Sequence, residues 1–153
     1  MELVKKLNYK ESLEVCVLNA PEAFFPFLHD IAQITTLTTS LSPESRVPLM
    51  LGFVLSKAEL SQMVKTVMKS IDTDTILWFA YPKKASRHYR SDINRDTGWE
   101  PLGSLGYEPV RQISLDEDWS ALRFRHVSKI KKLTRSRTMA LSEEAKQRLQ
   151  DHD

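Results

Sequence analysis

Four short apolar runs, separated by polar or helix-like segments, constrain the fold of this chain more than any other feature. They span residues 13–18, 33–39, 48–55 and 75–81 and are rich in the β-branched and aromatic residues that favour strands. The third and fourth runs are apolar at almost every position. Strands that are apolar on both faces are typical of a parallel sheet covered by helices, whereas a half-exposed sheet shows alternation. The pattern therefore predicts an α/β fold.

Helical patterns lie between these runs. A short helix is expected at 24–31, after the first run ends in the sequence Asn-Ala-Pro-Glu at 19–22. The clearest helix begins at Ser56, which forms a capping box with Glu59 and precedes an apolar stripe at helical spacing, namely Leu60, Met63, Val64, Val67, Met68 and Ile71. We interpret this stripe as packing on the sheet, with a groove for a partner as the alternative. Another short helix is expected to begin near Pro101 and to stop at Gly106.

The last two predicted strands differ from the first four. In the segments 110–115 and 121–127, apolar Leu122 and Phe124 alternate with Arg123 and Arg125, which indicates an antiparallel pair with one face toward water. Alternating βαβ units make right-handed crossovers. We therefore predict a three-layer, Rossmann-like, mostly parallel sheet of about six strands. Its expected strand order is 2-1-3-4-6-5, with strand six antiparallel and the C-terminal pair at one edge.

The chain of 153 residues has the size of one common domain. No repeat or flexible linker divides it, so we expect one Rossmann-like domain at 1–127 and a basic C-terminal extension at 128–153. Within the extension, Ser142 is expected to cap a short helix. The N-terminus is charged and the run 47–55 is too short to cross a bilayer, so no membrane contact and a cytoplasmic location are predicted.

Cysteine and histidine provide little for metal or thiol chemistry. Cys16 is the single cysteine and lies in an apolar run, where a buried hydrophobe is a better interpretation than a reactive thiol. It suits a reducing compartment. The four histidines show no metal-ligand spacing, so no metal site is predicted; they are His29, His88, His126 and His152.

Ligands of such sheets bind beyond the carboxyl ends of the strands, where the connections reverse, which is expected here between strands one and three. The rim would hold Asn19, Glu22, Ser56 and the segment 81–84. A nucleotide or S-adenosylmethionine binder places a glycine-rich turn after strand one. Here that loop has no glycine, Pro21 lacks an N–H, and Glu22 repels phosphate. No acid ends strand two either, so no cofactor is predicted.

The segment 82–96, after strand four, is the most suggestive candidate site. Charge-assisted hydrogen bonds to an anion are available from Lys83, Lys84, Ser86, Arg87 and Arg95. The alternative is a loop in which Asp92, Arg95 and Asp96 pair with one another and cap the next helix. His88 is a weak candidate for a general base, because no nucleophile accompanies it in a recognisable motif.

Two further charged segments have open interpretations. Residues 116–120 form a turn between strands five and six, with paired carboxylates for acid–base work or magnesium as the alternative. The second segment carries seven positive charges and no acid within 123–137. Since the whole chain has a net charge of +2 and these residues contribute +7, the rest carries −5. The seven are a solvated basic stretch or a contact for nucleic acid; they are Arg123, Arg125, Lys129, Lys131, Lys132, Arg135 and Arg137.

The order of several short motifs resembles a known family. The motifs are the Asn-Ala-Pro-Glu of 19–22, the Tyr-Pro-Lys-Lys of 81–84 with Ser86, the Asp-Ile-Asn-Arg-Asp of 92–96, and the stretch 116–123. Together they are similar to a family of small, uncharacterised bacterial proteins. The resemblance covers about residues 13–127. It implies a bacterial origin and a fold like that of class I methyltransferases without the glycine-rich cofactor loop, and it implies no activity.

These observations favour a non-enzymatic Rossmann-like domain that binds an anionic small molecule or a partner at the carboxyl edge of the sheet. The expected ligand-binding residues are Asn19, Glu22, Ser56, Lys83, Lys84, Ser86 and Arg95. One alternative is a nucleic-acid-associated module that uses the basic strand and tail, although no recognition motif is present and the tail has no aromatic residue for stacking on bases. The other is a divergent methyltransferase-like enzyme.

Overall fold

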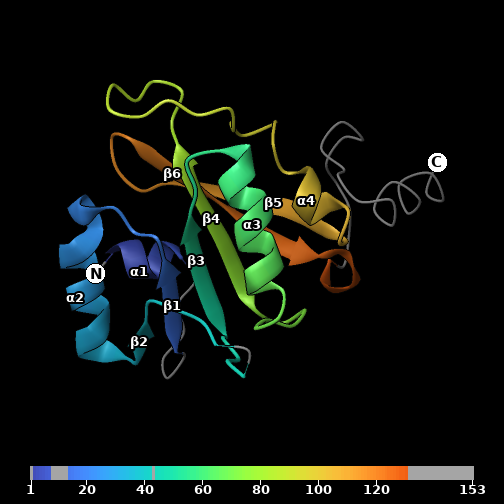
Figure 1. Cartoon of the computed structure of the whole chain (residues 1–153). Coiled ribbons are helices and arrows are strands. Elements are labelled where there is room, and N and C mark those ends of the chain that lie inside the picture. The colour runs from blue at the N-terminus through green and yellow to red at the C-terminus, as the bar shows by residue number, and fades with distance from the viewer. Residues whose placement is uncertain (1, 8–13, 43, 131–153) are drawn as a thin grey trace.

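The computed structural model describes residues 2–7, 14–42 and 44–130, and these form helices on both sides of one sheet (Figure 1). In chain order the elements are α1 (Glu2–Lys6), β1 (Val15–Leu18), the 3-10 helix η1 (Glu22–Phe24), α2 (Phe25–Ile34), β2 (Leu37–Thr38), β3 (Leu49–Phe53), α3 (Lys57–Val67), β4 (Ile76–Pro82), α4 (Glu100–Gly103), β5 (Tyr107–Ser114), β6 (Trp119–His126) and η2 (Val127–Lys129).

The six strands lie in the order β2-β1-β3-β4-β6-β5. The pairs from β2 to β4 are parallel, and β6 runs antiparallel to both β4 and β5. The predicted mostly parallel sheet, its strand order and its antiparallel C-terminal edge are thus confirmed. The carboxyl ends of β1, β3 and β4 consequently meet at one edge, where a Rossmann-like sheet places its ligands.

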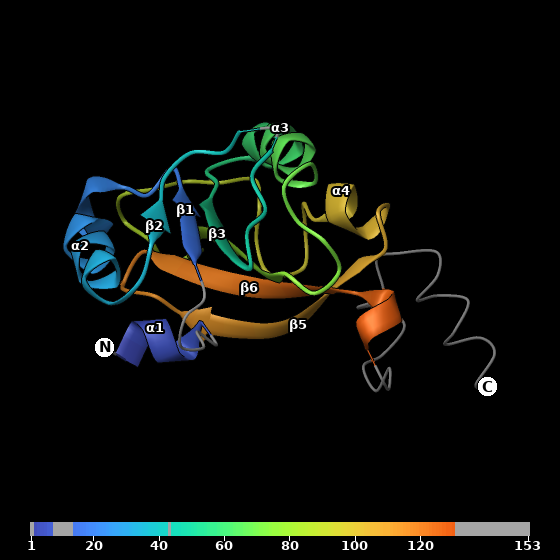
Figure 2. The same cartoon turned by 90° about the horizontal axis from the view of Figure 1, so that it is seen from below.

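Each face of the sheet is covered by its own apolar core. On one face, α3 and α4 pack over side chains that include Met50, Phe79 and Phe124. On the other face, α1 and the segment η1–α2 pack over Leu51 and Trp78. Figure 2 shows α3 and α4 on one side of the strands and α1 on the other. The central strands β3 and β4 are buried along their whole length, as expected for strands covered on both faces.

Several elements differ from the sequence-based prediction; β6, for example, begins at Trp119 rather than at residue 121. The second strand, expected at 33–39, is only Leu37–Thr38, because α2 continues to Ile34. The fifth strand begins at Tyr107, three residues early; it includes Pro109, which an edge strand tolerates, and a bulge follows. Helix α1 was not predicted. It is joined to the sheet where the Trp78 indole Nε1 donates to the Leu7 carbonyl at 2.9 Å.

The basic extension is only partly within the described residues. Its predicted helix, together with Lys131, Lys132, Arg135 and Arg137, lies outside them, so the division of the chain at 127 stays a prediction.

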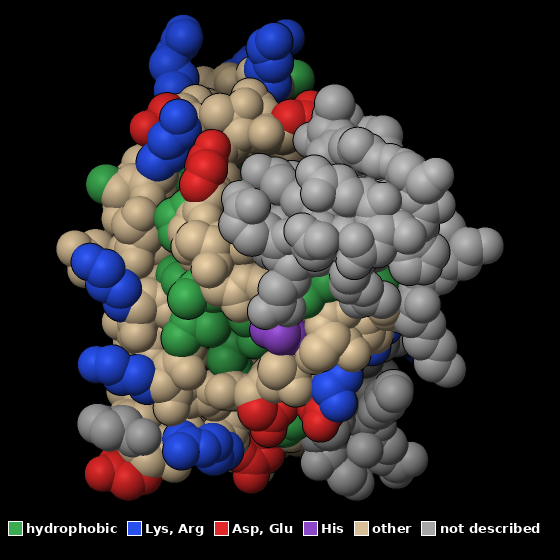
Figure 3. All heavy atoms as spheres, turned by 90° about the vertical axis from the view of Figure 1, so that its right-hand side faces the viewer, with side chains coloured by type: hydrophobic (Ala, Val, Ile, Leu, Met, Phe, Trp, Pro, Cys, Tyr) green, Lys and Arg blue, Asp and Glu red, His purple; other side chains and the backbone are tan. Residues whose placement is uncertain are grey.

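No helix in the described part of the chain has the length and apolarity to cross a membrane. Figure 3 shows the molecule from the side of α4, with Lys and Arg side chains along its upper edge. The loop after β4 lies at this upper edge in Figure 1.

Candidate functional site

Strand β4 ends at Pro82, and the loop of residues 83–97 follows it along the carboxyl edge of the sheet. The loop starts against the turn between β5 and β6. The Lys83 amide donates to the Asp118 carbonyl at 2.7 Å, and the Lys83 Nζ donates to Ser114 Oγ at 2.6 Å. These contacts extend the β4–β6 pairing by one residue and hold the lysine at the sheet edge.

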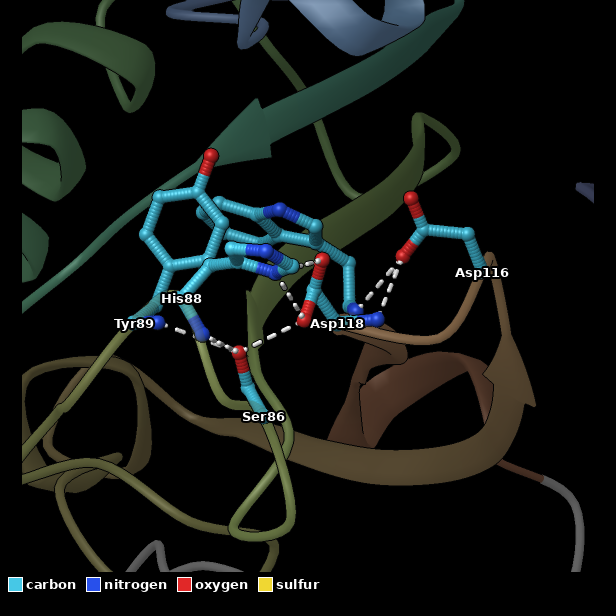
Figure 4. A network of polar contacts seen from close by, with 6 residues as sticks. Ser86, His88, Tyr89, Asp116 and Asp118 are labelled. Atoms are coloured by element: carbon cyan, nitrogen blue, oxygen red, sulfur yellow. Dashed lines mark hydrogen bonds and ion pairs between the residues drawn. The ribbon is translucent and has the colours of Figure 1, made fainter.

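Ser86, His88 and Asp118 form a polar network that fastens this loop (Figure 4). Ser86 Oγ donates to Asp118 Oδ1 at 2.8 Å and accepts the amides of His88 at 3.2 Å and Tyr89 at 3.1 Å. His88 Nδ1 lies 3.1 Å and 3.2 Å from the two Asp118 oxygens. The Tyr89 ring then packs on Trp119, with the ring centroids 5.0 Å apart.

The β5–β6 turn positions the aspartate at the centre of this network. Asp116 Oδ1 accepts the amides of Asp118 and Trp119, each at 2.8 Å. The turn predicted at 116–120 is therefore present, but it is shorter than predicted, because Trp119 and Ser120 already belong to β6. The Ser86 hydrogen bond holds the pKa of Asp118 below its ordinary value; contact with His88 and the charge of Lys83 act in the same direction, while desolvation opposes them. Asp118 is therefore a carboxylate that accepts from both neighbours.

The network limits the chemistry of its members. With Nδ1 held by Asp118 and the His88 side chain 73% exposed, the other ring nitrogen is open to solvent, as in a general base oriented by a carboxylate. Ser86 Oγ already makes three hydrogen bonds and is not free to act as a nucleophile. In the described part of the chain, no cluster of His, Cys, Asp and Glu has the composition of a metal site.

The far end of the loop is joined to the helices of the α3 face. Asp92 Oδ1 accepts the Lys57 amide at 2.8 Å, in the first turn of α3. The Asn94 carbonyl accepts from Trp99 Nε1 at 2.8 Å, and Ile93 is buried in the core beneath. The loop is thus attached at both ends, which keeps its side chains in place over the rim.

Two adjoining pockets open at this rim. One, of about 350 Å³, is lined by Tyr81, Lys83, Lys84, Asn94, Arg95, Asp96, Gln112 and Ser120; we call it the sheet pocket. The other, of about 510 Å³, is lined by Pro82, Lys83, Lys84, Ser86 and the segment 89–94; we call it the loop pocket. Lys83, Lys84 and Asn94 belong to both, so they form a shared wall.

The charge in these pockets is positive. Each pocket contains three cationic side chains and one carboxylate: Arg95 and Asp96 join the two lysines in the sheet pocket, and Arg90 and Asp92 join them in the loop pocket. Burial raises the pKa of Tyr81, which is within hydrogen-bonding reach of Ser120, so the Tyr81 hydroxyl stays protonated at neutral pH. The arrangement is suited to holding an anion beside neutral hydrogen-bonding groups.

The structure brings together some of the residues that the sequence indicated and separates others. Lys83, Lys84 and Arg95 share the sheet pocket, and Ser86 reaches the loop pocket with its hydroxyl already engaged. Ser56 instead caps α3 by accepting the Glu59 amide at 3.1 Å. Asn19 and Glu22 follow β1 and line neither pocket; Asn19 has a positive φ of 58°.

Residues distant in sequence complete the lining of the sheet pocket, and sequence reasoning did not include them among the candidate site residues. Gln112 and Ser120 come from β5 and β6, and the contact of His88 with Asp118 joins positions thirty residues apart. The proposed pairing of Asp92, Arg95 and Asp96 is not among the ion pairs of the described residues. Only the alternation in the C-terminal strands pointed toward this edge.

The basic segment is divided between strand and tail. On β6, Arg123 is half-buried; burial, with the charges of Arg125 and Arg111, lowers its pKa. Lys129 pairs with Asp74 at 3.0 Å. Within the described residues, the basic segment thus consists of Arg123 and Arg125 on β6 and of Lys129, which is paired with an acid.

Comparisons with known proteins bear on the fold. No family model matches the chain, and no curated protein matches it. Among solved structures, it is similar to the N-methyltransferase NodS from Bradyrhizobium japonicum, with a TM-score of 0.52, 13% identity, and coverage of 82% of this chain and 93% of that one.

Two further solved structures are similar to this chain in fold. The B. subtilis tRNA methyltransferase TrmK has a TM-score of 0.53 at 7% identity, covering 81% of this chain and 64% of that one. A SAM-dependent methyltransferase from Aquifex aeolicus has a TM-score of 0.50 at 11% identity, covering 80% and 87%. At such identities the likeness shows the fold alone: the chain has the Rossmann-like fold seen in class I, SAM-dependent methyltransferases.

Proposed function

We propose that this domain binds a small anionic ligand in the two pockets at the carboxyl end of β4. The observation that carries the proposal is the shared wall, where Lys83 and Lys84 face both pockets. Among the described residues, no ion pair engages Lys84, Arg90 or Arg95. Cationic side chains that converge on a concave site without paired acids are the expected features of an anion site.

The two wall lysines and three other side chains of the sheet pocket have separate parts in this proposal. Lys83 is oriented by Ser114 and keeps two further N–H groups for a ligand. Lys84 is exposed and adds a flexible positive charge. Arg95 presents a planar fork that matches two oxygens of a phosphate or carboxylate. The Tyr81 hydroxyl and the Gln112 amide supply neutral hydrogen bonds to the rest of the ligand.

Thermal unfolding with candidate anions tests the proposal. A ligand at a hundred times its dissociation constant stabilises the folded state by about 2.7 kcal/mol, which raises the Tm by about 5–10 °C for a chain of this size. We expect such shifts with nucleotides or other phosphate compounds. The double variant Lys84→Ala/Arg95→Ala should abolish them.

A matched control removes two charges elsewhere. Lys65 lies on α3 and Arg87 lies in the loop after β4, and neither lines the sheet pocket or the loop pocket. The variant Lys65→Ala/Arg87→Ala should therefore keep the shifts of the unmodified protein. Equal loss in both double variants, or no shift with any anion, contradicts the proposal.

The fold favours a second candidate, a divergent methyltransferase-like enzyme. The residues after β1 do not fit S-adenosylmethionine, because the first glycine of the chain is Gly52 and Pro21 has no N–H to offer. Adding S-adenosylmethionine to the same thermal assay separates the candidates. A shift with this compound, retained in Lys84→Ala/Arg95→Ala, would support the enzyme and weaken the anion site.

A further inference from the structure

The excess positive charge of the two pockets lies in the wall that they share. Outside the shared wall, the sheet pocket has one arginine and one aspartate, Arg95 and Asp96, and the loop pocket has the pair Arg90 and Asp92. Each flank is therefore neutral in sum. The excess positive charge belongs to Lys83 and Lys84, which lie between the flanks.

This distribution suits a ligand whose negative charge lies in its middle. We infer that the ligand is a phosphodiester that carries one neutral, polar group on each side, with its phosphate at the shared wall; the inference rests on the proposed anion site. A terminal phosphate monoester carries about two charges and has a substituent on one side only. It would leave one of the two pockets without a function.

The linings of the flanks agree with neutral groups that donate and accept hydrogen bonds. In the sheet pocket, Tyr81, Gln112 and Ser120 offer hydroxyl and amide groups beside the Asp96 carboxylate. In the loop pocket, Ser91 and Asp92 lie beside Tyr89 and the buried Ile93. Carboxylates at both ends accept from ligand hydroxyl or amino groups, which a second phosphate would lack. Sugars and bases carry such groups.

The pockets also have the size for one group each. Their volumes of about 350 Å³ and 510 Å³ lie within the range of small-molecule sites. A dinucleoside phosphate is the simplest compound with this layout, and a nucleic acid strand contains the same linkage. Both sources share the chemistry of the phosphodiester, so the experiment compares them.

The test measures dissociation constants of the full chain by calorimetry for four probes. These are inorganic phosphate, adenosine 5′-monophosphate, the dinucleoside phosphate adenylyl-adenosine, and single-stranded oligo-dA. We expect adenylyl-adenosine to bind at least about tenfold more tightly than the monophosphate, a difference of about 1.4 kcal/mol. Equal affinities for these two probes would overturn the inference while leaving the anion site intact.

Variants then separate the flanks. Gln112→Ala alters the sheet pocket only, and Arg90→Ala alters the loop pocket only. Each should weaken adenylyl-adenosine by about threefold or more relative to Arg87→Ala, while inorganic phosphate changes by less than about twofold. Lys84→Ala should weaken every probe. An effect from only one of the two flank variants would refute a ligand that occupies both pockets.

Three remaining outcomes are distinguishable. If no probe binds, or if Lys84→Ala/Arg95→Ala leaves binding unchanged, the proposed anion site itself is wrong. A strand of oligo-dA offers many equivalent phosphodiester linkages, which raises its apparent affinity in proportion to their number. If oligo-dA binds far more tightly than this number explains, the phosphodiester inference is supported and the ligand is a nucleic acid strand. Affinity that scales only with that number supports the small dinucleoside compound.

Discussion

Replacement of Ser86 by alanine tests whether one hydroxyl holds the loop over the candidate site. Ser86 Oγ makes three hydrogen bonds, one to Asp118 Oδ1 and two from the amides of His88 and Tyr89. Alanine removes all three and leaves space that water can enter. The loop would then keep its attachment at Lys83 and at Asp92 but lose the fastening between them.

The expected loss follows from these contacts. A hydrogen bond contributes about 0.5–1.5 kcal/mol net, and the lower value applies here because the groups are half-exposed and water can replace the serine. Three such bonds correspond to about 1.5 kcal/mol of unfolding free energy. For a chain of this length that lowers the Tm by about 3–6 °C. The pKa of Asp118 should rise, since the Ser86 hydrogen bond is the largest cause of its depression.

Urea unfolding measures the free energy, and carboxyl NMR titration measures the Asp118 pKa. Ser104→Ala is the control, because that hydroxyl makes a single exposed hydrogen bond to the Pro101 carbonyl at 3.2 Å. It should change stability by less than about 0.5 kcal/mol. If Ser86→Ala matches this control and leaves the Asp118 pKa unmoved, the fastening role is refuted.

Three other predictions address charge, thiol chemistry and packing. The pKa of Asp118 is lower in the folded state than in the unfolded state, where it is near 4. Its charged form therefore contributes stability above the unfolded pKa, and this stability is lost as the pH falls through the folded pKa. Asp118→Asn should flatten the acid limb of a plot of unfolding free energy against pH. Burial raises the pKa of the Cys16 thiol, so Ellman's reagent should react with it at pH 8 only after unfolding, and rapid reaction of the native chain would contradict the buried position. Trp78→Phe leaves the Leu7 carbonyl without its indole partner and should cost about 1–3 kcal/mol in urea unfolding; an unchanged midpoint would show that this contact does not stabilise the N-terminal helix.

The sheet was largely predictable because local patterns report burial. The runs that became β3 and β4 are apolar at successive positions, and only a strand covered on both faces requires that. The Ser56 cap with Glu59 likewise marks the start of α3 in the sequence and in the structure. Elements with weak local signals were predicted less well. The second strand was expected at 33–39 but has only two residues, and α1, which was not predicted, is joined to the sheet by a hydrogen bond from Trp78, far along the chain.

The candidate site was predictable only in part. The basic pair Lys83 and Lys84 directly follows a buried strand, so its place at the carboxyl edge follows from the chain itself. The partners that orient it do not. Ser114, Asp118 and Ser120 reach the rim because β6 inserts antiparallel between β4 and β5, which carries the β5–β6 turn back to the end of β4.

By itself, then, the sequence determined the strands, the order in which they lie, and the edge at which the cations gather, since each depends on hydrophobic periodicity and on short-range connections. The tertiary structure alone decided that Ser86 and Asp118 fasten the loop and that two pockets share one lysine wall. Those outcomes depend on distances between residues about thirty positions apart. Such distances are set by strand register and packing, and neither leaves a mark in a local stretch of residues.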